Sequence, residues 1–185
     1  MYDQYEEYET IGMKIAFVLM LFSLLMDIFD FPPLFTLQRN VLSQEKQFEV
    51  WTTILEKSGN FKFKLKDKIF ENVKLRRKMS EELFIALGEY LIRKKMGKWM
   101  DEVFLFYKKS ISDWGTQIYE IALNNGKINS IESIFSLKSD NEDLKTVPIE
   151  IIHSALIYLE TCNKCELIFE NESTNLDKCG VKFFH

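Results

Sequence analysis

Residues 31–38 are Phe-Pro-Pro-Leu-Phe-Thr-Leu-Gln, and they stand immediately ahead of the first amphipathic segment of the chain. Each proline fixes its own φ, and Pro33 pushes Pro32 out of the α region. The pattern therefore predicts an extended segment that is stiff before any partner arrives. Because little entropy is then lost on docking, Phe31 and Phe35 would each contribute roughly 1.5 to 3 kcal/mol of affinity in a receiving groove. The alternative, that the segment packs on its own domain, stays open.

The composition is that of a globular protein, since 46% of the 185 residues are hydrophobic and 28% are charged. This length accommodates one ordinary domain or two small ones. The net charge of −4 is made up of −5 for residues 1–59, +7 for residues 60–109 and −6 for residues 110–185. A basic middle between acidic flanks argues against nucleic-acid binding by the whole chain and would confine any phosphate binding to the middle.

Three cysteines, Cys162, Cys165 and Cys179, lie within the last 24 residues. An odd number in one cluster fits a reducing compartment better than a secreted disulfide scaffold. Cys162 and Cys165 have the spacing of a zinc half-site, which Cys179 and either His153 or His185 would have to complete. Because the second half-site lacks a close pair of its own, we expect buried or idle thiols and no metal.

An apolar run of 12 residues, Ile15–Met26, precedes the proline segment. As a helix it would be about 18 Å long, against a hydrocarbon core of about 30 Å. The acidic decapeptide at the start of the chain does not fit a signal peptide either. Three interpretations stay open: a spanning or signal segment, a membrane-surface or self-packing helix, and an untypical or wrongly assigned N-terminus.

The first unit is expected to contain a helix, a short strand, a longer helix and a hairpin. Ser43 is a suitable cap for the first helix, and Ser58-Gly59 would end it. Residues 61–66 alternate with a period of two, which is typical of a half-buried strand. A helix over residues 80–95 would stop at Gly97, and the closing hairpin follows at residues 99–107.

The second unit shows a similar order of elements. Its expected parts are a helix over residues 112–124, a short helix Ile131–Leu137, a turn Asp140–Asp143, a longer helix starting at Thr146 and Pro148, and strands Glu166–Glu170 and Val181–Phe184. Helix, strand, short helix, longer helix and hairpin is the order of a winged helix. We therefore predict an α+β fold with two tandem winged-helix domains, 30–109 and 110–185, after an N-terminal apolar helical segment, 1–29.

No catalytic or cofactor-binding pattern occurs in the chain. The seven glycines form neither a P-loop nor a dinucleotide-binding fingerprint. The two histidines stand beside no recognisable nucleophile motif. We therefore expect a protein that is not an enzyme and that binds no cofactor.

A basic run provides the alternative function, a nucleic-acid-binding winged helix that uses residues 62–78. The run contains eight cations and only two carboxylates. The cations are Lys62, Lys64, Lys66, Lys68, Lys74, Arg76, Arg77 and Lys78. However, the helix that would enter the major groove opens with Glu81-Glu82, and its counterpart in the second unit carries Glu150 and Glu160. Carboxylates there would repel phosphates, so we favour a solvated or partner-facing basic surface.

Four motifs in order suggest a family: residues 31–40, Asn72–Lys78, Asp113-Trp114-Gly115 and Gly180–Phe184. Together they resemble the small tandem winged-helix subunits of the ESCRT-II endosomal sorting complex, over about residues 30–184. The chain departs from that family in the 29 or so residues ahead of the proline motif, and in its cysteine cluster.

The resemblance implies a non-catalytic scaffold, two copies of which bind two larger ESCRT-II subunits in a Y-shaped heterotetramer. The residues that it assigns to this docking are Phe31, Pro32, Pro33, Leu34 and Phe35. It also implies that the second winged helix recruits the first-acting ESCRT-III subunit, through Ile131, Glu132 and Ser133. The expected setting is the cytoplasm, with recruitment to the endosomal membrane for sorting of ubiquitinated cargo into multivesicular bodies. A membrane-associated protein held by Ile15–Met26 is a further hypothesis.

Overall fold

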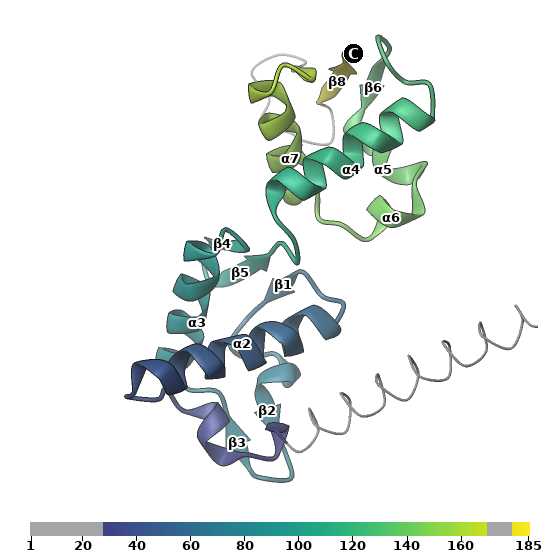
Figure 1. Ribbon diagram of the computed structural model, residues 1–185. Helices are drawn as coiled ribbons and strands as arrows, with labels where there is room; N and C mark the ends of the chain where they lie inside the picture. The colour runs from purple at the N-terminus through teal and green to yellow at the C-terminus, as the bar shows by residue number, and fades with distance from the viewer. Residues whose placement is uncertain (1–27, 170–178) are drawn as a thin grey trace, which may run out of the picture. The chain divides into compact units, whose positions relative to one another are not determined.

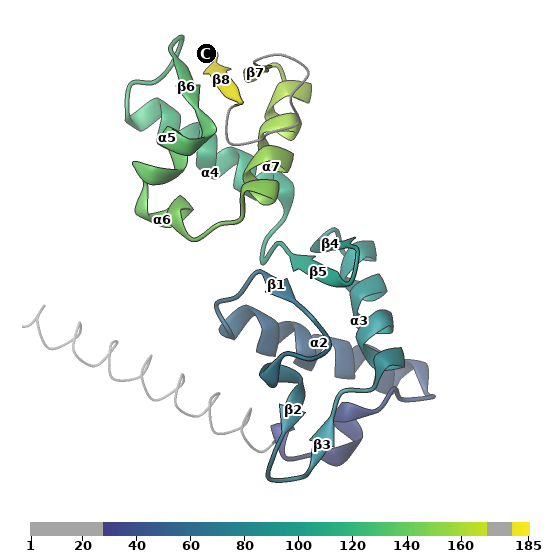
Figure 2. The same cartoon turned by 180° about the vertical axis from the view of Figure 1, so that it is seen from behind.

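The computed structural model describes residues 28–169 and 179–185, and Figures 1 and 2 show it from opposite sides. The described chain divides into two compact units, residues 28–58 with 64–87 and residues 59–63 with 88–169 and 179–185. In these residues no helix combines the length and the apolarity that crossing a bilayer requires. The predictions for Ile15–Met26 fall outside the described residues.

Short elements surround one long helix in the first unit. They are η1 (Pro32–Phe35), α2 (Val41–Lys57), η2 (Lys68–Phe70), β2 (Glu71–Asn72), β3 (Arg77–Lys78) and the first half of α3 (Glu81–Arg93). Helix α2 begins earlier than predicted, because Asn40 is the cap and its side chain accepts a hydrogen bond from Ser43 N. It ends at Lys57, with Ser58 as the C-cap and Gly59 next at φ +77°, where the sequence predicted its end.

Aromatic rings form the core of this first unit. Phe35 and Trp51 meet edge to face with ring centroids 5.7 Å apart, and Phe70 lies 5.6 Å from Trp51 on the same measure. Phe84 of α3 continues the series, 5.2 Å from Phe70. Such pairs add about 0.5 to 1.5 kcal/mol each beyond the burial of their surface. The core therefore joins η1, α2, η2 and α3.

The second unit contains most of the strands. Its elements are β1 (Lys62–Phe63), the end of α3, β4 (Gly97–Met100), β5 (Val103–Phe106), α4 (Ile111–Asn124), β6 (Ile131–Ser133), α5 (Ile134–Ser139), α6 (Glu142–Lys145), α7 (Ile149–Thr161), β7 (Cys165–Ile168) and β8 (Gly180–Phe183). Two antiparallel three-stranded sheets have the orders β1-β5-β4 and β6-β8-β7. In both sheets the last strand along the chain lies in the middle.

Three local predictions were wrong. Residues 131–133 form strand β6, which pairs with β8, and the short helix α5 starts only at Ile134. The predicted turn at Asp140–Asp143 contains the start of α6, which Asn141 caps. Gly97 does not stop α3: the helix ends at Arg93, Lys95 takes φ +58°, and Gly97 opens β4.

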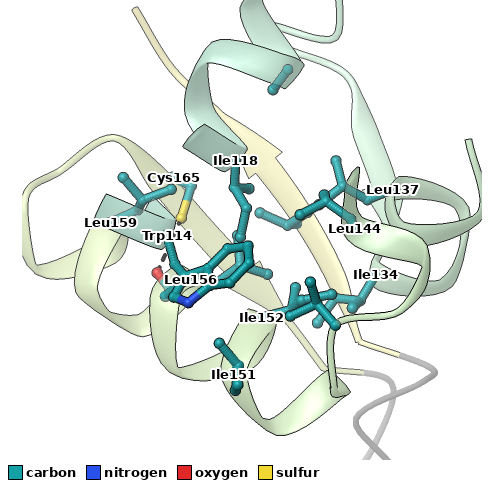
Figure 3. Packing of buried hydrophobic residues seen from close by; sticks show 14 of the residues in the cluster. Trp114, Ile118, Ile134, Leu137, Leu144, Ile151, Ile152, Leu156, Leu159 and Cys165 are labelled. Atoms are coloured by element: carbon teal, nitrogen blue, oxygen red, sulfur yellow. Dashed lines mark hydrogen bonds between the residues drawn. The ribbon is translucent and has the colours of Figure 1, made fainter. Parts of the chain in front are cut away.

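Helices α4 and α7 pack beside the sheet β6-β8-β7 around a continuous apolar core (Figure 3). Trp114 and Ile118 come from α4, and Ile152 and Leu156 come from α7. Phe183 of β8 is fully buried in the same cluster. Each large apolar side chain buried in this way contributes roughly 1.5 to 3 kcal/mol to the folded state.

Candidate docking site

A pocket of about 350 Å³ opens beside η1 in the first unit. Its walls are mainly apolar and include Ile28, Phe31, Pro33 and, from α2, Lys46, Gln47 and Val50. The volume lies at the small end of the usual range for binding pockets, about 300 to 1,000 Å³. It therefore suits one or two apolar side chains of a protein partner.

The proline segment beside this pocket is a 3-10 turn, so the prediction of an extended segment was wrong. Phe31 is extended, as the residue before a proline should be. Pro32 then starts a turn in which Leu34 N donates to Phe31 O at 3.0 Å. A proline at this first position loses nothing, because its missing N–H would have had no partner inside the turn.

Gln47 of α2 holds the turn in place. Its side chain is 5% exposed, and its Oε1 accepts a hydrogen bond from Gln38 N at 3.3 Å. Its Nε2 lies 3.1 Å from the carbonyl oxygens of Pro33 and Leu34 and 2.9 Å from that of Thr36. The amide group has two protons, so these three oxygens share them. Contacts across 9 to 14 residues thus override the local preference of the prolines.

Leu34 and Phe35 point into the core of the first unit. Phe35 is 1% exposed, and its carbonyl oxygen accepts from Ser80 N at 3.0 Å. Trp51 Nε1 donates to Leu34 O at 2.9 Å. The expectation that Phe35 contributes its burial free energy to a partner is therefore wrong for this conformation, because its own unit already buries it.

The outer side of η1 presents the apolar surface that a partner can reach. Phe31 is 58% exposed, Pro32 is exposed, and Pro33 is half-buried. The first turn of α2 adds Val41 and Leu42, which are also exposed. The turn therefore divides the predicted motif into an outer half, Phe31–Pro33, and an inner half, Leu34 and Phe35, that packs in the core.

Asp30, immediately before this motif, is tied to the β2–β3 hairpin. Asn72 Nδ2 donates to Phe29 O at 2.9 Å and to Asp30 Oδ1 at 3.1 Å. Lys74 forms an ion pair with the same carboxylate. The hydrogen bond from Lys74 lowers the pKa of Asp30 below its usual value, and the bond from Asn72 adds to this. Both ends of the proline motif are thus anchored.

From the sequence, neither Gln47 nor Trp51 was expected to take part in the docking site. A signal was present, because Gln47, Trp51 and Leu55 are four residues apart and so share the buried face of α2. A polar residue in that series needs buried partners. The backbone oxygens of η1 are those partners.

The second predicted site, Ile131–Ser133, is an edge strand of the sheet β6-β8-β7. Ile131 is 65% exposed, and Phe135 in the following helix is equally exposed. Ser133 caps α5, its Oγ accepting from Ser136 N at 3.0 Å. The three residues therefore share a strand but differ in role, and Ile131 supplies the exposed apolar surface.

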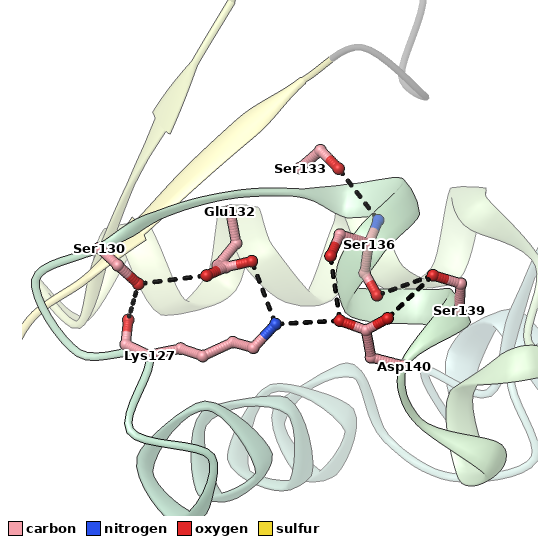
Figure 4. A network of polar contacts seen from close by, with 7 residues as sticks. All are labelled: Lys127, Ser130, Glu132, Ser133, Ser136, Ser139 and Asp140. Atoms are coloured by element: carbon pink, nitrogen blue, oxygen red, sulfur yellow. Dashed lines mark hydrogen bonds and ion pairs between the residues drawn. The ribbon is translucent and has the colours of Figure 1, made fainter.

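Glu132 belongs to a polar network that surrounds Lys127 (Figure 4). Lys127 Nζ lies 3.1 Å from Glu132 Oε2 and 3.1 Å from Asp140 Oδ2. The hydrogen bond to Glu132 is the main cause that raises the pKa of Lys127, and the hydrogen bond to Asp140 is the next largest. In turn, the hydrogen bond from Lys127 lowers the pKa of Asp140. Ser130 Oγ also donates to Glu132 Oε1 at 3.3 Å. This network positions Glu132 beside the chain's own lysine, which leaves it little capacity for an apolar partner.

The three cysteines differ in burial. Cys165 is buried, and this burial raises the pKa of its thiol to about 12, so the free thiol stays protonated at neutral pH. Cys179 is buried and Cys162 is exposed. In residues 28–169 and 179–185, no group of three or more His, Cys, Asp or Glu side chains could hold a metal ion.

The basic run is partly neutralised by its neighbours. Lys78 pairs with Glu71 at 3.2 Å, and Lys74 pairs with Asp30. Glu81 and Glu82 are exposed at the start of α3, as predicted from the sequence. The contacts leave Arg76 and Arg77 as exposed cations of the hairpin.

The model of one protein family matches residues 28–151, and its description is ESCRT-II complex subunit. This match spans more than half of the chain. The chain belongs to the ESCRT-II complex subunit family. Its relatives in that family include vacuolar protein-sorting-associated protein 25 of Xenopus laevis, 30% identical over 171 residues that cover 84% of this chain and 95% of the relative. The protein of the same name from Homo sapiens is 29% identical over 171 residues, covering 84% of this chain and 94% of its own length.

Solved ESCRT-II structures have the same fold. Subunit VPS25 of the endosomal trafficking complex ESCRT-II superposes with a TM-score of 0.73 at 18% identity, covering 84% of this chain and 96% of that one. A chain of the VPS22/VPS25/VPS36 complex gives a TM-score of 0.71 at 15% identity, covering 84% and 97%. These likenesses confirm the predicted α+β fold with two tandem winged helices.

Proposed function

We propose that this chain is a non-catalytic scaffold subunit of ESCRT-II that docks to larger subunits through the outer side of η1. The observation that carries the proposal is the exposed Phe31 beside an apolar pocket, on a turn that Gln47 and Trp51 hold. A turn that is rigid before binding has little conformational entropy to lose. Its affinity for a partner then depends mainly on the apolar surface that becomes buried.

The partners proposed here are counterparts of VPS22 and VPS36, the two other subunits named for one of the similar structures. We assign the partner contacts to Phe31, Pro32 and Pro33. Leu34 and Phe35 keep the motif in shape from inside the unit. The proposed heterotetramer contains two copies of this chain. Each copy is proposed to have winged-helix domains at residues 30–109 and 110–185.

The second winged helix is proposed to recruit the first-acting ESCRT-III subunit at the endosomal membrane, where ubiquitinated cargo is sorted into multivesicular bodies. Ile131 and Phe135 support this choice, since both are exposed apolar side chains on neighbouring elements. Glu132 and Ser133 would shape the strand and the helix start, because their polar atoms bond within the chain. The cytoplasm, with recruitment to that membrane, is the proposed location.

Co-purification with the two larger ESCRT-II subunits tests the docking site. Phe31→Ser removes the exposed ring while leaving Leu34 and Phe35 in the core. Because about half of the ring is available to a partner, we expect a loss of about 1 to 2 kcal/mol, roughly 5- to 30-fold in Kd. The matched control is Ile157→Ser, which removes an exposed apolar side chain from α7 and should leave assembly intact.

Thermal unfolding of both variants separates a docking defect from a folding defect, since the two side chains are exposed and neither change should shift Tm appreciably. If Phe31→Ser assembles with wild-type affinity, the outer side of η1 is not the docking site. The ESCRT-III assignment is tested separately with Phe135→Ser. This variant should still join the complex but bind less of the purified ESCRT-III subunit, and unchanged binding would reject the assignment.

A further inference from the structure

The β2–β3 hairpin of the first unit presents an apolar tip among cations. Strands β2 and β3 pair through Glu71 with Lys78 and Asn72 with Arg77, so residues 73–76 form the connecting loop. Val73 in this loop is 78% exposed, more than any other large apolar side chain in the part of the chain that the structure describes. An apolar side chain this exposed does not contribute to the core of its own unit.

The hairpin is held firmly at its base. Asn72 is buried, and its Oδ1 accepts from Leu75 N at 3.0 Å, which closes the loop. Arg76 N donates to Val73 O at 3.2 Å, and Arg76 has φ +51°. Beyond β3, Met79 N donates to Phe70 O at 2.8 Å and links the hairpin to the aromatic core. The tip therefore keeps its shape without a partner.

Cations flank this tip along the chain. Residues 64–78 carry seven cations and two carboxylates. Lys74 and Lys78 have carboxylate partners. Among the residues that the structure describes, Arg76 and Arg77 make no ion pair. Such a surface attracts an anionic partner.

The exposed valine decides which anionic partner fits. Proteins that bind single-stranded nucleic acid stack bases on aromatic rings, and the loop residues 73–76 contain none. Duplex DNA would meet the exposed carboxylates of Glu81 and Glu82 at the start of the next helix. A bilayer interface accepts both components, since its headgroups attract cations and its acyl boundary takes up a small apolar side chain.

We propose that the β2–β3 hairpin binds the surface of bilayers containing anionic phospholipids, with Arg76 and Arg77 at the headgroups and Val73 at the acyl boundary. This contact needs no other subunit, so it goes beyond the proposed scaffold function. In a complex it would orient the first unit against a membrane. Each arginine near an anionic surface adds about five-fold in affinity.

Co-sedimentation of the full chain with vesicles tests the proposal. The vesicles are phosphatidylcholine alone and a mixture of phosphatidylcholine with phosphatidylserine, each at low and at physiological ionic strength. The hairpin variant is Arg76→Gln with Arg77→Gln. Its control, Lys57→Gln with Arg93→Gln, removes two exposed cations at the ends of α2 and α3. A third variant, Val73→Ser, removes the apolar tip alone.

We expect binding to the anionic vesicles that weakens with salt and falls on the order of 25-fold in the hairpin variant, while the control stays within about two-fold of wild type. Val73→Ser should weaken binding without reducing its dependence on salt. Equal binding to both kinds of vesicle, or an equal loss in the control, would overturn the proposal. If the chain bound vesicles through Ile15–Met26 instead, it would bind both kinds of vesicle equally, because an apolar run does not require anionic lipid. Tighter binding to a DNA duplex than to anionic vesicles would assign the hairpin to nucleic acid.

Discussion

Replacing Gln47 by methionine tests whether a single side chain of α2 holds the docking turn. Methionine has nearly the same length and helix propensity but no amide group. In the variant the Gln38 N–H loses its acceptor, and the oxygens of Pro33, Leu34 and Thr36 each lose one donor. A second donor remains for each oxygen, from the side chain of either Gln38 or Trp51, so the N–H is the group left without a partner.

An unpaired, partly buried N–H costs about 1 to 3 kcal/mol, and the weakened carbonyl contacts add to it. We therefore expect Gln47→Met to lose about 2 kcal/mol of unfolding free energy. Urea titration followed by tryptophan fluorescence measures this, because Trp51 lies against the same turn. The control is Glu49→Met, an exposed position on the same helix. A Gln47→Met variant within about 0.5 kcal/mol of wild type, the range of ordinary surface changes, would refute the argument.

Two further predictions concern a strand glycine and an acid-sensitive ion pair. Gly97→Ala would place a Cβ 2.5 Å from a ring atom of Phe104, so we expect a loss of about 1 to 3 kcal/mol in urea unfolding; Gly180→Ala, whose Cβ would have contacts of 3.4 Å and longer, should be tolerated, and equal effects would contradict this reading of the packing. Lys74 lowers the pKa of Asp30 from its usual 3.8, so the stabilisation from this carboxylate is present at neutral pH and is lost as the pH falls through the lowered pKa. Asp30→Asn should accordingly be less stable than wild type at neutral pH, with a difference that shrinks on acidification in urea titrations at a series of pH values, and a difference that stays constant would exclude the ion pair as its cause.

The parts of the fold that follow from local patterns were predictable from the sequence. Helix α2 ends beside Ser58 and helix α3 begins beside Ser80, where capping residues and apolar periodicity agree. The alternation around Phe63 also identified strand β1, although only two residues of it pair. These signals need no knowledge of the rest of the chain.

The remaining parts depend on partners that are distant in sequence. The proline rules describe an isolated segment, whereas the turn at Pro32–Phe35 is set by Gln47 and Trp51 on another element. Ile131–Leu137 is apolar enough for a short helix, but its first three residues pair with Gly180–Lys182, about 50 residues later. The family resemblance assigns residues 31–35 to docking, and that assignment stays a prediction. Their division into an outer and an inner half could not be predicted from the sequence, because it depends on the buried contacts of Leu34 and Phe35.

The strand orders β1-β5-β4 and β6-β8-β7 have a consequence for the order of events during synthesis. The middle strand of each sheet is the last one that the ribosome makes, so both outer strands wait with unpaired edges until it appears. Unpaired edges are sites where chains stick to each other. The risk of aggregation is thus highest just before β5 or β8 emerges from the ribosome. A chaperone that covers β4 or β7 at that stage would reduce this risk most.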